Sequence, residues 1–161
     1  MIIVNGQRTP TISLISQEQV KDIGGTVELE CSVQFARDYP VIWIKKDSSN
    51  QQNPLIISSG STLIIRDSRF SLRFDQSSSL FTLQVKDLQE TDAGIYQCQI
   101  LIGVSSHVTA DVNVMVRMPP VISDNSTRSL VVSEKQPVTL ECYASGYPLP
   151  KISWCVNALD T

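Results

Sequence analysis

The sequence predicts an all-β fold, on the basis of three observations. Its apolar residues are mostly Val, Ile and Leu in short runs separated by Ser, Asp, Asn, Gly and Pro, which is typical of strands joined by turns. The run that ends at Cys31 alternates polar and apolar residues, so Val27, Leu29 and Cys31 share one face of a strand. Lastly, a tryptophan follows a cysteine at the same separation in two places, first after Cys31 and again after Cys142. This repetition predicts two copies of one β unit.

The charges of the 161-residue chain nearly balance, with 13 Lys and Arg against 16 Asp and Glu. No overall field attracts phosphate backbones or anionic membrane surfaces, so we expect no nucleic acid partner. No run approaches the roughly 20 apolar residues that a membrane helix needs. Residues 1–7 lack the basic residues and cleavage site of a signal peptide. We expect this segment to be disordered, and the export signal and any anchor to lie outside this sequence.

Four cysteines and a single histidine do not provide the spacing of a zinc site. Disulfides are the better interpretation of the cysteines, and they place the protein outside the cell. Asn125 begins the sequon Asn-Ser-Thr, which predicts glycosylation. No catalytic triad, carboxylate pair or phosphate-binding glycine loop is visible in the sequence. We therefore expect no enzyme activity, no metal and no cofactor.

The most specific motif is Asp-Ala-Gly-Ile-Tyr-Gln-Cys, in which Asp92, Tyr96 and Cys98 share one strand face. A buried tyrosine two residues before a buried cysteine can turn its hydroxyl back to the backbone, an arrangement called the tyrosine corner. With Cys31, Trp43 and Cys98 in this order, the chain resembles the immunoglobulin superfamily.

This resemblance implies an immunoglobulin-like β-sandwich in which a disulfide joins Cys31 to Cys98. It also implies that Arg69, which opens a strand, forms a bidentate salt bridge with Asp92. Both features have structural roles, so they belong to the framework and not to a binding site. The core residues that we expect around the disulfide are Trp43, Tyr96 and Leu83.

The spacing between Trp43 and Cys98 leaves room for two extra strands, at residues 55–58 and 62–65. Nine strands are typical of variable-like domains, whereas constant-type domains have seven. We expect the first immunoglobulin domain to span residues 8–117, because Pro119 and Pro120 cannot extend a central ladder.

Residues 118–161 begin a second unit, whose Ala-x-Gly-x-Pro-x-Pro-x-Ile-x-Trp pattern resembles the intermediate set of immunoglobulin domains. No second tyrosine-corner motif follows, so this unit contains no partner for Cys142. We expect an incomplete domain with A to C strands only, and free thiols at Cys142 and Cys155. The apolar side chains that this leaves exposed are those of Val138, Leu140, Ile152 and Trp154.

In finer detail, the chain resembles a family of insect cell-surface adhesion proteins that have three immunoglobulin domains and a lipid anchor. The likeness is carried by residues 8–13, 22–27, 61–63, 67–71, 89–94 and 119–127. It implies a lipid-anchored protein that mediates homophilic adhesion at the cell surface. In related adhesion molecules the first domains pair through the C, C′, C″, F and G strands, which implies a weak homodimer and partners from the same superfamily.

Strand periodicity predicts which residues lie on the outer side of that face. Residues that neighbour the inward-facing Trp43 and Cys98 point outward, and the C′ strand adds either Ile56 or the pair Leu55 and Ile57, depending on its register. Branched apolar side chains ringed by Gln and Lys are typical of an interface, although scattered surface hydrophobes are also ordinary. The predicted adhesion face consists of Ile42, Ile44, Ile57, Gln97, Gln99 and Leu101.

Two alternatives from other classes remain open. The first is a soluble ligand-binding or immune recognition module, whose site would lie in the loops at residues 35–40 and 102–107. The second is a structural spacer of a longer receptor, with no binding face. Self-association distinguishes adhesion from both alternatives, since a strict monomer argues for a ligand module or a spacer.

Overall fold

The computed structural model of the protein describes residues 6, 8–46 and 53–155. The chain divides into two compact units, unit 1 (Met1–Val116) and unit 2 (Arg117–Thr161). The expectation of disorder at residues 1–7 falls outside the described residues, except for Gly6, which is exposed and has no regular structure.

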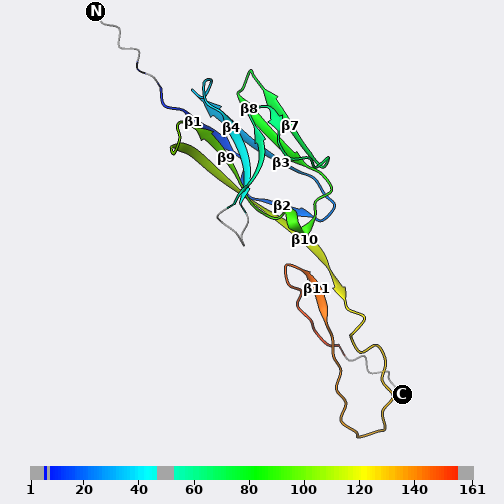
Figure 1. Ribbon diagram of the computed structural model, residues 1–161. Helices are drawn as coiled ribbons and strands as arrows, with labels where there is room; N and C mark the ends of the chain where they lie inside the picture. Colours follow the sequence, from blue (N-terminus) through cyan, green and yellow to red (C-terminus); the bar gives the residue numbers. More distant parts are fainter. Residues whose placement is uncertain (1–5, 7, 47–52, 156–161) are drawn as a thin grey trace, which may run out of the picture. The chain divides into compact units, whose positions relative to one another are not determined.

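Unit 1 is built from two antiparallel sheets (Figure 1). The first sheet has the order β1-β3-β8-β7, and the second has the order β10-β9-β4-β5-β6, with β2 pairing on β10. The strands of the first sheet are β1 (Thr11–Ile15), β3 (Val27–Gln34), β7 (Phe70–Asp75) and β8 (Leu80–Val85). Those of the second are β2 (Gln19–Asp22), β4 (Val41–Lys46), β5 (Leu55–Ser59), β6 (Thr62–Leu63), β9 (Gly94–Leu101) and β10 (His107–Ile122).

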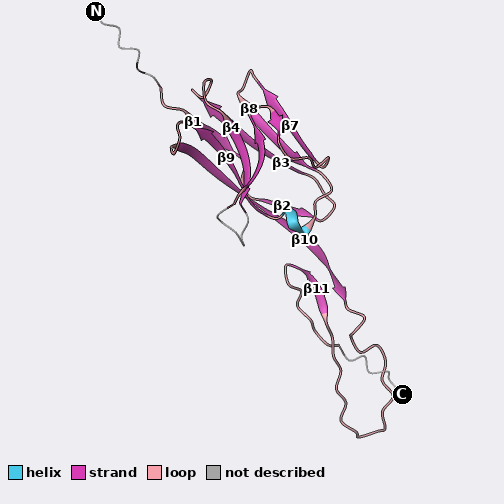
Figure 2. Cartoon of the chain, in the orientation of Figure 1, coloured by secondary structure: helices cyan, strands magenta, loops and turns pink. Residues whose placement is uncertain are grey.

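Regular structure in the described residues is almost all strand, as the sequence predicts (Figure 2). The helical exception is a short 3-10 turn, η1 (Glu90–Asp92), which precedes β9. The extra strands β5 and β6 lie between β4 and β7 in the chain, as expected for a variable-like domain. β6 is shorter than the predicted strand because the amides of Ile64 and Ile65 both donate to the carbonyl of Ile57.

The core of unit 1 lies between the sheets, because alternate residues of each strand point inward. In β3 this period buries Val27, Leu29 and Cys31 and leaves Glu28 exposed. Cys31 and Cys98 form the predicted disulfide, with their Cα atoms 6.4 Å apart. Three further residues expected in the core are fully buried there: Trp43, Leu83 and Tyr96.

The described part of unit 2 contains one strand of its own, β11 (Ala144–Tyr147), which pairs with the end of β10 between Met118 and Ile122. The expected strands that lead to Cys142 and to Trp154 are absent from the described part of this unit. The backbone before Cys142 is joined instead to the segment that follows β10, through hydrogen bonds that include one from the amide of Thr127 to the carbonyl of Glu141.

The side chains of unit 2 show why its strand content is low. Both thiols are free, and the four apolar side chains that were expected to be exposed are exposed: Val138, Leu140, Ile152 and Trp154. A strand is stabilised when its apolar face is covered by a second layer. Since these faces stay open to solvent, the backbone here gains little from forming a regular ladder.

Candidate interaction face

The framework beneath the candidate face begins with the tyrosine corner. The hydroxyl of Tyr96 donates to the carbonyl of Asp92 at 2.9 Å, and the ring is fully buried. Burial, together with the nearby negative charge of Asp92, raises the pKa of Tyr96, so the phenol stays neutral at physiological pH. This contact holds the start of β9 in place.

Arg69 connects the start of β7 to η1 through a bidentate salt bridge. Its Nη1 and Nη2 lie 2.5 and 3.2 Å from the two carboxylate oxygens of Asp92. The guanidinium also donates to Asp67, at 2.8 Å from Nη2. Hydrogen bonds from Arg69 lower the pKa of Asp67, and the two carboxylates raise the pKa of Arg69. The bridge that the sequence implies is therefore part of a three-residue ionic cluster.

The outer side of the second sheet is ordered in rows by the strand register. In one row Ile44 of β4 lies opposite Gln97 of β9, which lies opposite Asp111 of β10. In the next row along these strands, Ile42 lies opposite Gln99. Directly opposed residues of an antiparallel pair point to the same face, so the rows define one continuous outer surface.

A chain of polar contacts crosses this surface. Gln99 donates from Nε2 to Oε1 of Gln97, and Gln97 in turn donates to Oδ1 of Asp111 at 2.5 Å. Lys46 forms a salt bridge with Asp111 at 3.0 Å. These contacts join β4, β9 and β10, so much of the polar surface of the face is arranged before any partner binds, which reduces the entropic cost of association.

Three residues of the predicted face are buried, and the prediction that they are exposed is wrong. Ile57 is 0 % exposed and lies in the core, because a β-bulge between β4 and β5 makes it the extra residue that points inward. Ile44 and Gln97 point outward but are only 4 and 6 % exposed. They lie on β4 and β9, which have a neighbouring strand on each side in the sheet.

The remaining predicted residues of the face, Ile42, Gln99 and Leu101, are half-buried. Two exposed apolar residues also lie on this face: Ile56, one of the alternatives that the sequence left open for its strand, and Ile95. Leu55 is exposed as well, but it pairs with Lys45 on the side of the sheet that carries Tyr96. Ile56 pairs with Ile44, and Ile95 pairs with Lys46, so both lie on the outer side. The alternation of β9 already contained the signal for Ile95, whereas the choice between Ile56 and Ile57 depended on a register that only the structure gives.

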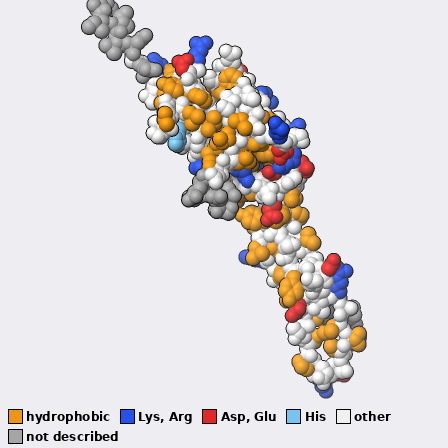
Figure 3. Space-filling model, in the orientation of Figure 1, with side chains coloured by type: hydrophobic (Ala, Val, Ile, Leu, Met, Phe, Trp, Pro, Cys, Tyr) orange, Lys and Arg blue, Asp and Glu red, His pale blue; other side chains and the backbone are white. Residues whose placement is uncertain are grey.

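The surface carries no single charge sign. Figure 3 shows hydrophobic side chains at the surface of both units, with acidic and basic residues interspersed. Within the residues that the structure describes, no group of His, Cys, Asp and Glu side chains is placed to hold a metal ion. The same part of the chain has no helix that is long and apolar enough to cross a membrane.

Similar sequences carry the name of an insect adhesion protein. The chain is 70 % identical to lachesin of Schistocerca americana over 152 residues, which are 94 % of this chain and 44 % of that protein. It is 61 % identical to lachesin of Drosophila melanogaster over 92 % of this chain and 40 % of that protein. These relatives confirm the resemblance inferred from the sequence, and the chain spans less than half of their length.

Two of the similar solved structures are complexes of immunoglobulin domains. A structure titled as Dpr1 IG1 bound to DIP-eta IG1 is 28 % identical with a TM-score of 0.53, and covers 66 % of this chain and 96 % of that one. A complex of Dpr2 Ig1-Ig2 with DIP-Theta Ig1-Ig3 is 26 % identical with a TM-score of 0.57, over 72 % of this chain and 52 % of that one.

The matched family is described as the immunoglobulin V-set domain, and the match covers residues 16–117. That range takes in strands of both sheets of unit 1, from β2 to β10, together with the disulfide and the tyrosine corner, and leaves out β1. Domains of this kind are not enzymes, in agreement with the sequence analysis. The chain therefore belongs to the immunoglobulin V-set domain family.

Proposed function

We propose that the chain is part of a cell-surface adhesion protein and that unit 1 binds a second copy of itself through the outer side of β4, β5, β9 and β10. The similarity to lachesin supports an adhesion role. The complex of Dpr1 IG1 with DIP-eta IG1 supports a first immunoglobulin domain as the partner, since two such domains bind each other there. By the same resemblance, the parent protein is extracellular and held by a lipid anchor.

The observation that carries the proposal is a polar network flanked by exposed apolar side chains. Ile56 and Ile95 are exposed on the face, although each costs free energy when it stays in water. The pair Lys46 and Asp111 presents both charge signs on the same surface. A surface with both signs can be complementary to itself across a two-fold axis, where each contact occurs twice.

The expected interface is of modest strength. One sheet face of this size provides about 800 Å² per partner, the area of a standard protein interface. Its polar residues are already paired within one copy, so they add specificity more than affinity. The apolar side chains therefore account for most of the gain on association, and a weak dimer is the expected state.

Replacing Ile56 with lysine tests the face. Ile56→Lys places a charge where the partner excludes water, so we expect dimerisation to weaken at least about tenfold. The measurement is sedimentation velocity on the full chain over a range of concentrations, in a Cys142→Ser, Cys155→Ser background that prevents cross-linking through the free thiols. Ile44→Lys is a poorer probe, since Ile44 is buried and its replacement would perturb the fold.

Leu14→Lys is the matched control, because Leu14 lies in β1 of the other sheet and is 46 % exposed, the same fraction as Ile56. It should leave the dimer intact. A strict monomer at every concentration would contradict the proposal and favour a ligand module or a spacer. Equal weakening by both lysine variants would assign the contact to a surface other than this sheet face.

We also propose that Asn125 is glycosylated. It is exposed in a turn that follows β10, where a glycan meets no steric barrier. Expression in insect cells should give a mass that falls on treatment with a peptide N-glycosidase. Thr127→Ala should abolish that shift and Ser126→Ala should retain it, because the sequon requires a hydroxyl only at its third position. A wild-type mass that the glycosidase leaves unchanged would contradict this assignment.

A further inference from the structure

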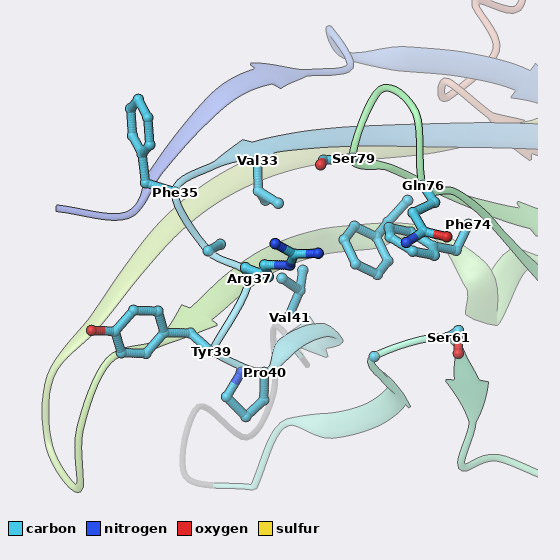
Figure 4. A pocket seen from close by; sticks show the side chains of 13 residues that line it. Val33, Phe35, Arg37, Tyr39, Pro40, Val41, Ser61, Phe74, Gln76 and Ser79 are labelled. Atoms are coloured by element: carbon cyan, nitrogen blue, oxygen red, sulfur yellow. The ribbon is translucent and has the colours of Figure 1, made fainter. Parts of the chain in front are cut away.

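A cavity of about 570 Å³ opens at one end of unit 1, away from the rows of the interaction face (Figure 4). Its walls come from the segment between β3 and β4, from the turn between β5 and β6, and from the hairpin of β7 and β8. A volume of this size falls in the range of pockets that hold small organic ligands. The segment at residues 35–40 lines the cavity, and the segment at residues 102–107 contributes no lining residue.

The floor of the cavity is apolar. Val33, Val41 and Phe81 belong to the hydrophobic core and present their outer ends to the cavity. Phe74 stacks on Phe81 with the ring centroids 4.5 Å apart, and Phe74 remains exposed. An exposed aromatic ring beside an uncovered part of the core can gain from a ligand that supplies a further ring.

Two residues that line the cavity have a left-handed backbone conformation. Phe35 has a φ of 56° and Ser79 a φ of 49°, and both residues line the cavity. A left-handed conformation is unfavourable for a bulky residue and is concentrated at functional sites. As a result the ring of Phe35 points away from the cavity (Figure 4), and the guanidinium of Arg8 lies 4.9 Å from its centroid. The aromatic ring that was available to fill the space is directed elsewhere.

Arg37 supplies the charge of the cavity. Its side chain extends into the space beside Val33 and Val41 (Figure 4). It has no ion-pair or hydrogen-bond partner within the described ranges, and it is the one charged residue of the lining. A free guanidinium in such a setting matches a carboxylate, to which it can donate two parallel hydrogen bonds.

We propose that this cavity binds a small aromatic carboxylate, with the ring against Phe74 and Phe81 and the carboxylate on Arg37. The site goes beyond the adhesion proposal, because no residue of the predicted interaction face lines it. The apolar floor of the cavity favours the aromatic ring of the ligand, and its single positive charge favours the carboxylate.

The test uses the full chain and two probes that share the phenyl ring and the alkyl chain and differ in the head group, the carboxylate 4-phenylbutyrate and the neutral alcohol 4-phenylbutan-1-ol. At ordinary ligand efficiency a molecule of this size binds with a Kd of about 1 mM. Titration followed by two-dimensional ¹H–¹⁵N NMR should shift the amides of Arg37, Ser61 and Ser79 in a saturable way. The carboxylate should bind about tenfold more tightly than the alcohol, which is the usual gain from a charge-assisted hydrogen bond.

Arg37→Gln should remove that preference and leave the affinity for the alcohol unchanged. Arg73→Gln is the matched control: Arg73 is exposed on β7 beside Phe74 but does not line the cavity, so this variant should bind as the wild type does. Ser61→Trp, at an exposed lining position, should fill the space and block both probes. Equal affinity for the two probes, equal weakening by Arg73→Gln, or no saturable shift at the lining amides would each overturn the proposal.

Discussion

Removal of the disulfide, by Cys31→Ala with Cys98→Ala, is expected to lower the free energy of unfolding of unit 1 by about 4 kcal/mol. The bond closes a loop with a sequence separation of 67. A loop of that length restricts the unfolded chain strongly, and the loss of this restriction favours unfolding. Both cysteines are fully buried, so the alanine variant also loses packing against the core.

Urea unfolding followed by near-UV circular dichroism measures this change, since Trp43 lies in the core beside the bond. The control is Cys142→Ser with Cys155→Ser, which removes the same number of sulfur atoms from unit 2, where both thiols are free. That variant should leave the unfolding transition of unit 1 unchanged. An unchanged transition in the Cys31 and Cys98 variant would contradict the role assigned to the bond.

The disulfide also bears on the interaction face. Cys98 lies in β9 between Gln97 and Gln99. The side chains of these two glutamines point to the other side of the strand and form the polar network there. A looser β9 would disturb this network, so we expect the variant without the disulfide to dimerise less well even under conditions where it is folded. Loss of stability and loss of self-association should therefore appear together.

Arg69→Met is expected to cost about 3 kcal/mol, the lower end of the range for breaking a buried ion pair by removing one partner. The side chain of Asp92 is 7 % exposed and would lose both of its bonds to the guanidinium. The amide of Gln89 would still donate to that carboxylate. One backbone hydrogen bond does not offset an unpaired charge at this level of burial.

Thermal and urea unfolding of Arg69→Met compared with Arg73→Met isolates the effect. Arg73 lies on the same strand, β7, but is exposed and forms no salt bridge with the residues that the structure describes. Its replacement should change the free energy of unfolding by less than about 0.5 kcal/mol. Similar losses in the two variants would show that the cost arises from the missing side chain and not from the unpaired Asp92.

Predictions from the sequence succeeded where a residue type and a spacing leave one physical solution. Cys31, Trp43, Tyr96 and Cys98 are such residues, because their spacing places them all on inward strand faces. The sequence also predicted the exposed apolar side chains of unit 2, among them Val138, Leu140 and Ile152. These inferences depend on the alternation of side chains along a strand and on residue composition, and tertiary contacts alter neither.

Predictions failed where a residue's exposure depends on its neighbours in space. The two-residue period of the strands placed Ile44 and Gln97 on the outer face correctly, but it could not show that both side chains are buried there. Ile57 was assigned to the wrong side because a bulge shifts the register of β5, and a shift of one residue reverses every side chain beyond it. The sequence contains no marker for this bulge.

The sequence by itself determined the inward faces of the strands through their alternation. Its Cys–Trp–Cys order and tyrosine-corner motif resemble those of immunoglobulin domains, and this resemblance implied the variable-like sandwich of unit 1 and its disulfide. Only the tertiary structure decided which residues of the sheet face reach solvent, and that a cavity with Arg37 opens at one end of unit 1. Exposure and cavities are properties of several strands and turns brought together, and no single strand pattern encodes them.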